Sequence, residues 1–223
     1  MTKVKVCGLM NKKDIDLCVV AGVDILGFVV DYPLSVPWNL TVVEAKSLLQ
    51  IVPPSISTCA VVGGSVRKII TIADNIHPDI IQLHYKETVE EIKVLVQELN
   101  ERGIKVVKAL CIDSEGKCDF EIREPELAAK ELNKIGLSAI LVDSYTDSRP
   151  GGTGVQVDFS TFKTIQKVSS IPVVLAGGLN PENISSVISE IHPDVVDVLT
   201  GVENKPNQKD DEKINKFVRM CQI

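Results

Sequence analysis

A thiol and a carboxyl group are the two side chains of this sequence best suited to proton transfer. Cys7 ends an apolar run that begins at Val4, and Asp143 ends the run 140–142. A free thiol has a pKa of about 8.5, so a small fraction is thiolate at neutral pH. A carboxyl group in apolar surroundings keeps its proton to higher pH and can act as an acid. Cys7 and Asp143 are therefore a candidate acid–base pair.

The neighbours of these two groups allow more than one interpretation. Lys5 precedes Cys7 by two residues, so both side chains lie on the same face if the segment is a strand. If that face is the interior, the positive charge of Lys5 favours the thiolate. The alternative is that Lys5 pairs with a buried carboxylate. Asp143 has a structural alternative as well, as a cap on the loop residues Tyr145 or Thr146.

Two glycine-containing turns late in the chain are typical of a phosphate site. A Gly-Gly pair separates a predicted strand from a helix, and a Thr-Gly pair follows the next strand. Glycine lets a ligand approach the backbone, and a helix start offers N–H donors and a positive dipole end. The alternative is two tight turns that require glycine. The predicted phosphate-binding residues are Gly177, Gly178, Thr200 and Gly201.

Short β-branched apolar runs alternate with amphipathic segments along the whole chain. The predicted strands are 4–7, 25–30, 58–62, 80–83, 106–110, 139–143, 173–176 and 195–199. The predicted helices include 41–50, 65–75, 88–101, 124–135, 180–190 and 209–221, with Asn180 as the cap of its helix. Eight βα units favour an α/β fold with one domain over residues 1–223, a closed (β/α)8 TIM barrel. An open doubly wound sheet is the rival, but its glycine fingerprint is missing after the first run.

A repeated hexapeptide supports two similar halves. Residues 76–81 (IHPDII) recur as residues 191–196 (IHPDVV), and each copy is predicted to end a helix and begin a strand. His77 and His192 are therefore predicted to be structural. His84 instead follows the fourth strand, at the end where barrels carry their functional groups. Cys111 follows the fifth strand and is interpreted as a packing residue.

Composition excludes several classes of function. The chain has 223 residues, 24 Lys and Arg against 30 Asp and Glu, and a net charge of −6, which disfavours a nucleic-acid partner. The sequence contains no apolar run of signal-peptide or membrane-span length, so we expect a cytoplasmic protein without a membrane partner. The six irregularly spaced cysteines are expected to be reduced. Because zinc, Walker-type and hydrolase motifs are missing, we expect no metal and no cofactor.

Four groups of residues carry a resemblance to a known enzyme family. They are 4–9 (VKVCGL); 81–84 (IQLH); Asp143 with 151–154 (GGTG) and 158–159 (DF); and 176–183 (AGGLNPEN) with 196–198 (VDV) and 200–203 (TGVE). In this order they resemble the phosphoribosylanthranilate isomerases, (β/α)8 enzymes of tryptophan biosynthesis. Each segment alone is weakly specific, but together they span almost the whole chain.

The resemblance implies an Amadori rearrangement of N-(5-phosphoribosyl)anthranilate to a 1-deoxyribulose 5-phosphate product. Cys7 matches the family's base and Asp143 its acid, and the two glycine turns match its phosphate loops. His84 and Asp197 lie in the matching segments and are candidate substrate contacts. The resemblance thus implies a phosphosugar as the small-molecule partner and an aldose–ketose isomerase as the enzyme class.

One departure from the family leaves alternatives open. The family usually has an arginine after the second strand, near the anthranilate end of the substrate, and residues 33–39 contain none. Arg149, after Asp143, is the candidate to replace it. The alternatives are an isomerase of another phosphorylated aminoaldose and a non-catalytic phosphosugar-binding barrel. The sequence does not distinguish a monomer from a homodimer.

Overall fold

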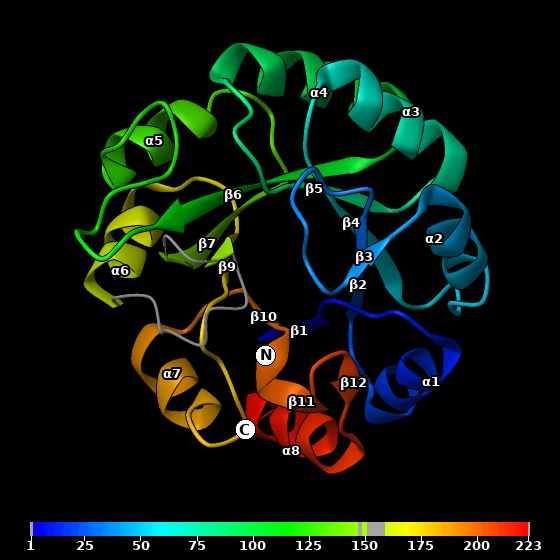
Figure 1. Cartoon of the computed structure of the whole chain (residues 1–223). Helices are drawn as coiled ribbons and strands as arrows, with labels where there is room; N and C mark the ends of the chain where they lie inside the picture. Colours follow the sequence, from blue (N-terminus) through cyan, green and yellow to red (C-terminus); the bar gives the residue numbers. More distant parts are fainter. Residues whose placement is uncertain (1, 147–148, 151–158, 223) are drawn as a thin grey trace.

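A closed barrel of parallel strands forms the centre of the molecule. The computed structural model describes residues 2–146, 149–150 and 159–222, and only the backbone at 145–146 and 149–150. Within the described part of the chain, eight strands pair in parallel around the barrel, and β1 closes it by pairing with both β2 and β10 (Figure 1). They are β1 (Lys3–Val6), β2 (Ile25–Val30), β4 (Ser57–Val62), β5 (Ile80–Leu83), β6 (Lys105–Ile112), β7 (Ala139–Thr146), β9 (Val173–Leu175) and β10 (Val195–Val198). The predicted (β/α)8 barrel is confirmed.

Helices surround this barrel on the outside (Figure 1). They are α1 (Lys12–Ala21), α2 (Val42–Leu49), α3 (Val66–Ile76), α4 (Val89–Glu101), α5 (Pro125–Leu132), α6 (Phe159–Val168), α7 (Ile184–Ile191) and α8 (Asp211–Cys221). Short elements decorate the rim: β3 (Asn39–Leu40), β8 (Arg149–Pro150), the 3-10 turn η1 (Thr200–Val202), and the hairpin of β11 (Glu203–Lys205) and β12 (Gln208–Lys209). Capping boxes at Thr41 and Thr88 start α2 and α4, because each hydroxyl and the glutamate three residues later satisfy N–H groups of the first turn.

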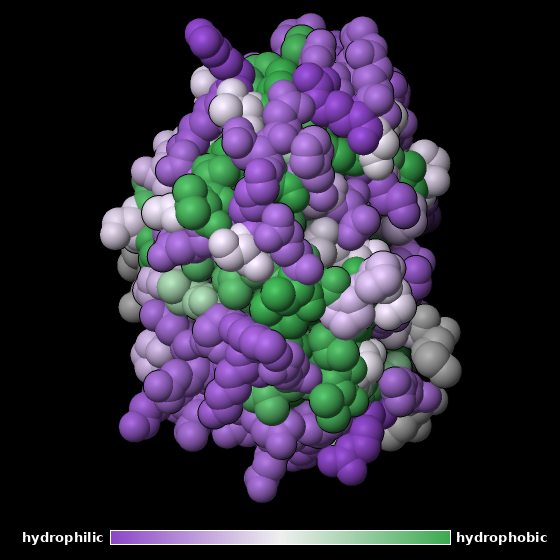
Figure 2. Space-filling view, turned by 90° about the vertical axis from the view of Figure 1, so that its right-hand side faces the viewer, coloured by the Kyte–Doolittle hydropathy of each residue, from purple (hydrophilic) through white to green (hydrophobic). Residues whose placement is uncertain are grey.

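Alternation along each strand divides its side chains between two environments. Val4 and Val6 face the helices and belong to the main apolar core, whereas Cys7 packs with Val29 and Val61 in a separate cluster. The face shown in Figure 2 is mostly hydrophilic, with patches of apolar side chains near its centre. No helix among the described residues has the length and apolar character needed to cross a membrane.

The repeated hexapeptide makes the same structure twice, as predicted. His77 ends α3 and His192 ends α7, both in the left-handed conformation with φ of 44° and 45°. In each copy, the aspartate two residues later accepts a hydrogen bond from the backbone N–H of Thr58 or Val173 on the preceding strand. Both histidines therefore lie at the amino-terminal end of the strands, away from the catalytic end of a barrel.

One predicted helix start is wrong. The helix expected from Asn180 begins at Ile184. The side chain of Asn180 instead accepts hydrogen bonds from the N–H groups of Glu182 and Asn183, closing a separate turn. Asparagine side chains stabilise turns of this kind by the same hydrogen bond that would otherwise cap a helix.

Candidate active site

A cavity opens at the carboxyl-terminal end of the barrel strands. Its lining includes every site residue predicted from the sequence whose side chain the structure describes: Cys7, His84, Asp143, Gly177, Gly178, Asp197, Thr200 and Gly201. These residues come from β1, β5, β7, β9 and β10 or from the loops that follow them. The side chain of Arg149 and the segment 151–158, with its glycines and Asp158, lie outside the described residues.

The two glycine turns meet at one side of this cavity. Gly177 and Gly178 have φ angles of 87° and 64°, which residues with a side chain rarely adopt. A side-chain carbon placed on Gly201 would lie 1.9 Å from the carbonyl oxygen of Leu179, so the turn after β10 packs directly on the turn after β9. In the turn before α7, Asn180 and Asn183 each accept a hydrogen bond from the other's backbone N–H group, whereas the first turn of α7 itself has no side-chain cap.

Cys7 lies buried at the end of β1, beside a buried ion pair. The Nζ atom of Lys5 is 2.6 Å from Oδ2 of Asp197, the residue opposite it on β10. The alternative in which Lys5 pairs with a carboxylate is therefore correct. Burial disfavours the charged form of Lys5, but Asp197 and the thiols of Cys7 and Cys59 together outweigh this, so the pKa of Lys5 is raised.

The pKa of Cys7 is raised, although the sequence predicts that Lys5 favours the thiolate. Burial raises the pKa of the Cys7 thiol, and the charge of Lys5 opposes that increase without cancelling it. Lys5 thus acts in the expected direction, but desolvation dominates. Room for the thiol comes from Gly27, where a side-chain carbon would lie 2.8 Å from Sγ of Cys7.

Asp143 has the properties expected of an acid. Its side chain is buried, and burial raises its pKa to about 7, although the backbone N–H of Ser144 donates to Oδ1 over 2.7 Å and opposes the shift. This N–H belongs to the next residue along the chain rather than to the predicted cap partners. A side-chain carbon on Gly177 would lie 3.0 Å from Oδ1, so the acid adjoins the glycine turns.

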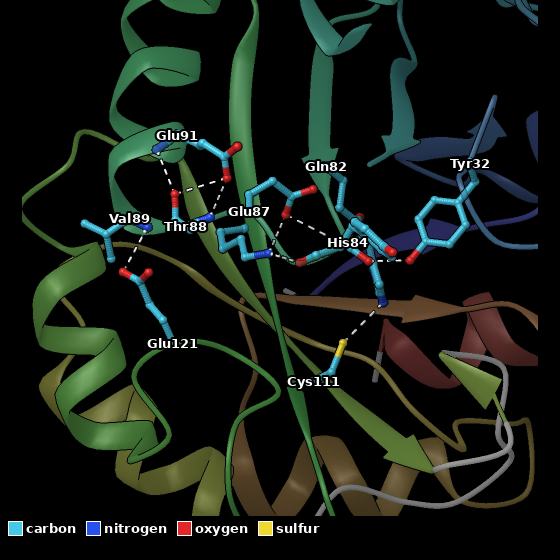
Figure 3. Close-up of polar contacts among 11 residues, drawn as sticks. Tyr32, Gln82, His84, Glu87, Thr88, Val89, Glu91, Cys111 and Glu121 are labelled. Atoms are coloured by element: carbon cyan, nitrogen blue, oxygen red, sulfur yellow. Dashed lines mark hydrogen bonds and ion pairs between the residues drawn. The ribbon is translucent and has the colours of Figure 1, made fainter. Parts of the chain in front are cut away.

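His84 contacts groups from three strands, and Figure 3 shows two of its partners, Gln82 and Cys111. Its Nδ1 is 2.9 Å from the amide nitrogen of Gln82 on β5, and its Nε2 is 3.5 Å from Sγ of Cys111 on β6 and 3.6 Å from Oδ2 of Asp143 on β7. Burial, followed by the charges of Lys108 and Lys5, lowers the pKa of His84 to about 3, so the ring is neutral at pH 7. The interpretation of Cys111 as a packing residue is thus incomplete, because it contacts a ring at the site.

The lining of the cavity also includes aromatic and apolar side chains. Trp38 is buried and donates from Nε1 to Oε1 of Glu203 over 3.1 Å, and that carboxylate also binds Nζ of Lys209 at 3.0 Å. Tyr32 packs edge-on against Tyr85 and donates from its hydroxyl to the carbonyl oxygen of His84 at 2.5 Å. The described residues that line the cavity include no Arg or Lys.

Sequence reasoning missed several of these residues. Gln82 lies two residues before His84, and the two-residue alternation of a strand was the signal that could have linked them. For Trp38 the sequence left the role undecided between a substrate-facing ring and a dimer contact. The sequence did not predict that Glu203 pairs with Lys209, because this pairing depends on the rim hairpin of β11 and β12.

Comparisons with known proteins agree with this geometry. The family model for N-(5'phosphoribosyl)anthranilate (PRA) isomerase matches residues 4–220. The chain is 32% identical over 221 residues to the N-(5'-phosphoribosyl)anthranilate isomerase of Methanopyrus kandleri, covering 98% of each protein. It is 31% identical over 222 residues to that of Acinetobacter calcoaceticus, covering 99% of this chain and 97% of the relative.

Solved structures show the same relationship. The phosphoribosyl anthranilate isomerase of Thermotoga maritima superimposes with a TM-score of 0.82 at 29% identity, covering 100% of this chain and 99% of that one. A phosphoribosyl anthranilate isomerase in complex with reduced 1-(o-carboxyphenylamino)-1-deoxyribulose 5-phosphate has a TM-score of 0.79 at 28% identity, with the same coverage. The chain therefore belongs to the N-(5'-phosphoribosyl)anthranilate isomerase family.

Proposed function

We propose that this chain isomerises N-(5'-phosphoribosyl)anthranilate with Asp143 as the general acid and Cys7 as the general base. The isomerase activity in tryptophan biosynthesis follows from the family. The observation that supports the two roles is that both side chains line one cavity together with the converging glycine turns. Such an Amadori rearrangement needs one proton donor and one acceptor near the sugar.

The proposed steps use only these two side chains. Asp143, still protonated at pH values up to about 7, protonates the furanose ring oxygen, and the bond from that oxygen to C1 breaks. The nitrogen lone pair forms the iminium. The thiolate of Cys7 then removes the proton from C2, and the electron pair of that C–H bond forms the enolamine. Tautomerisation of the enolamine gives the ketose product.

The cavity suggests the direction in which the substrate lies. The backbone of Gly177, Gly178 and Gly201 would hold the phosphate, because glycine permits close approach of an anion to backbone N–H groups. The anthranilate ring would then lie against the aromatic side chains of Tyr32 and Trp38, which line the same cavity. A related enzyme that binds a reduced form of the product supports a phosphosugar of this length as ligand.

The anthranilate carboxylate is the part of the substrate with the fewest evident partners. Because the described lining residues include no cation, Arg149 remains the proposed partner for it. The same observation favours one second candidate function, an isomerase of another phosphorylated aminoaldose. If that is correct, an aminoaldose phosphate without an aryl carboxylate will turn over faster than the anthranilate compound.

The decisive assay uses freshly prepared N-(5'-phosphoribosyl)anthranilate and follows the loss of its anthranilate-type fluorescence. We expect turnover well above the uncatalysed background. A folded protein that binds the substrate without turnover would instead support a non-catalytic phosphosugar-binding barrel.

We also propose that the chain works as one domain, 1–223, in the cytoplasm without a nucleic-acid or membrane partner. Light scattering will distinguish a monomer from a homodimer.

The pH profile of kcat/KM should be a broad plateau. Activity requires protonated Asp143 together with the Cys7 thiolate. Below pH 7 the thiolate fraction grows with pH while Asp143 stays protonated, so activity rises. Between the two pKa values the gain in thiolate cancels the loss of protonated Asp143. Above the raised pKa of Cys7 the thiol is already ionised, so only the loss of protonated Asp143 continues and activity falls. A maximum near pH 5 would contradict these roles.

Gly201→Ala should weaken substrate binding. Its new methyl group would collide with the carbonyl oxygen of Leu179 and push the two turns apart. We expect KM to rise about tenfold or more, with a smaller change in kcat, because charge-assisted phosphate contacts are lost. Gly103→Asn is the matched control, since this position has φ of 73° and open space around it. An unchanged KM in Gly201→Ala would remove this turn from the phosphate site.

A further inference from the structure

The two ring nitrogens of His84 face partners of opposite character. Nδ1 faces the amide nitrogen of Gln82 at 2.9 Å, and an amide NH2 group only donates hydrogen bonds. Nε2 faces the carboxyl group of Asp143 and the sulfur of Cys111, at 3.6 Å and 3.5 Å. The neutral imidazole has one nitrogen that accepts and one that donates. With the amide nitrogen of Gln82 facing the ring, Nδ1 accepts from Gln82, and this arrangement places the ring proton on Nε2.

Gln82 is itself held in place. It is 2% exposed on β5, and its amide oxygen lies 3.9 Å from the thiol of Cys59 on β4. The backbone at His84 is held separately, because the hydroxyl of Tyr32 donates to its carbonyl oxygen (Figure 3). Two independent contacts thus restrain the imidazole, one through its ring and one through its main chain.

We propose that Gln82 is a positioning residue, whose side-chain amide holds His84 in the tautomer that presents Nε2–H to Asp143. This inference rests on the proposed role of Asp143 as the acid. When Asp143 gives its proton to the substrate, a buried carboxylate forms. The Nε2–H group then becomes a donor to that carboxylate, and the separation of 3.6 Å needs to shorten only slightly to form a hydrogen bond.

Other charged groups surround this contact. Lys5 on β1 and Asp197 on β10 act on Asp143 with opposite signs, and the N–H of Ser144 already donates to Oδ1. Lys108 on β6 acts on His84 but is 2.6 Å from Glu87. The imidazole faces Oδ2 with a hydrogen it can donate, and Gln82 holds the ring in that orientation.

The first experiment measures the tautomer directly. The chain has only three histidines, so 15N NMR of the histidine-labelled protein resolves each ring, and His84→Asn assigns its signals. Between pH 5 and 8 we expect Nε2 of His84 to carry the proton and Nδ1 to show the shift of an acceptor nitrogen. A proton on Nδ1 in the unmodified protein overturns the inference, whatever its activity. Lack of turnover in that same protein would instead reject the proposed function.

The second experiment removes the donor. Gln82→Met keeps the length and burial of the side chain but leaves Nδ1 without its partner. We expect the 15N spectrum to show a mixture of tautomers. We also expect the break between the rising limb and the plateau of kcat/KM, which marks the pKa of Asp143, to move up by about 0.5–1 pH unit, because the Asp143 carboxylate loses a donor. Cys59→Ala is the matched control, since it disturbs the other end of the same amide and leaves the contact with His84 intact. An unchanged profile in Gln82→Met overturns the proposal.

A double substitution separates positioning from packing. If Gln82 acts through His84, then Gln82→Met adds no further pH shift in a His84→Asn background. Residues in one hydrogen-bond network are expected to show this non-additivity. If instead the two shifts add, Gln82 acts independently of the imidazole and the proposal is wrong.

Discussion

Asp143→Asn should abolish most of the isomerase activity and at the same time make the protein more stable above pH 7. An asparagine has no proton to give to the ring oxygen, and loss of a general acid typically lowers kcat about 100-fold or more. The amide oxygen can still accept from the N–H of Ser144, so the turn at the end of β7 is expected to persist.

The expected gain in stability follows from the raised pKa of Asp143. In the unfolded chain this carboxyl group loses its proton near its ordinary pKa of about 3.9, but in the folded protein it keeps the proton up to about 7. Between these values the folded state binds more protons, so the free energy of unfolding decreases as the pH rises from about 4 to about 7. Asparagine does not ionise, so the free energy of unfolding of Asp143→Asn does not decrease in this way as the pH rises.

Thermal denaturation at pH 4, 6 and 8 tests this expectation. The difference in Tm between Asp143→Asn and the unmodified protein should be small at pH 4 and grow towards pH 8. Asp16→Asn is the matched control, because its carboxylate on α1 is 57% exposed and pairs with Lys12. Asp16→Asn should change neither the activity nor the pH dependence of Tm. Near-normal turnover of Asp143→Asn would exclude Asp143 as the acid.

Cys7→Ser should lower kcat by about 100-fold or more. A serine hydroxyl has almost the shape of the thiol but ionises at far higher pH, so almost no alkoxide forms to remove the C2 proton. KM should change little, because the glycine turns and the aromatic side chains of the cavity stay intact. Steady-state kinetics at pH 7.5 measures both effects.

Cys221→Ser is the control for this prediction. Cys221 is also a buried free cysteine, but it lies on α8 rather than in the lining of the cavity. Its replacement should leave kcat unchanged. Activity of Cys7→Ser within a few-fold of the unmodified protein would assign the base role to another residue.

The sequence alone determined the barrel and the residues that gather at its mouth. Eight alternating βα units predict a parallel sheet, and parallel strands bring their carboxyl-terminal ends to the same side. Cys7, Asp143 and the two glycine turns each end or follow such a strand, so their meeting in one cavity follows from local pattern and topology. The repeated hexapeptide likewise predicted its own local structure, because helix ends and strand starts depend on nearby residues.

Only the tertiary structure decided how these groups are paired and charged. Lys5 binds Asp197, 192 positions away in the sequence, and the ring of His84 lies between Gln82 and Cys111 on neighbouring strands. The alternation of a strand tells which face a side chain occupies but not which atom of another strand lies beside it. The pKa values of Cys7 and Asp143 depend on burial and on distances through space, which the order of residues along the chain does not contain.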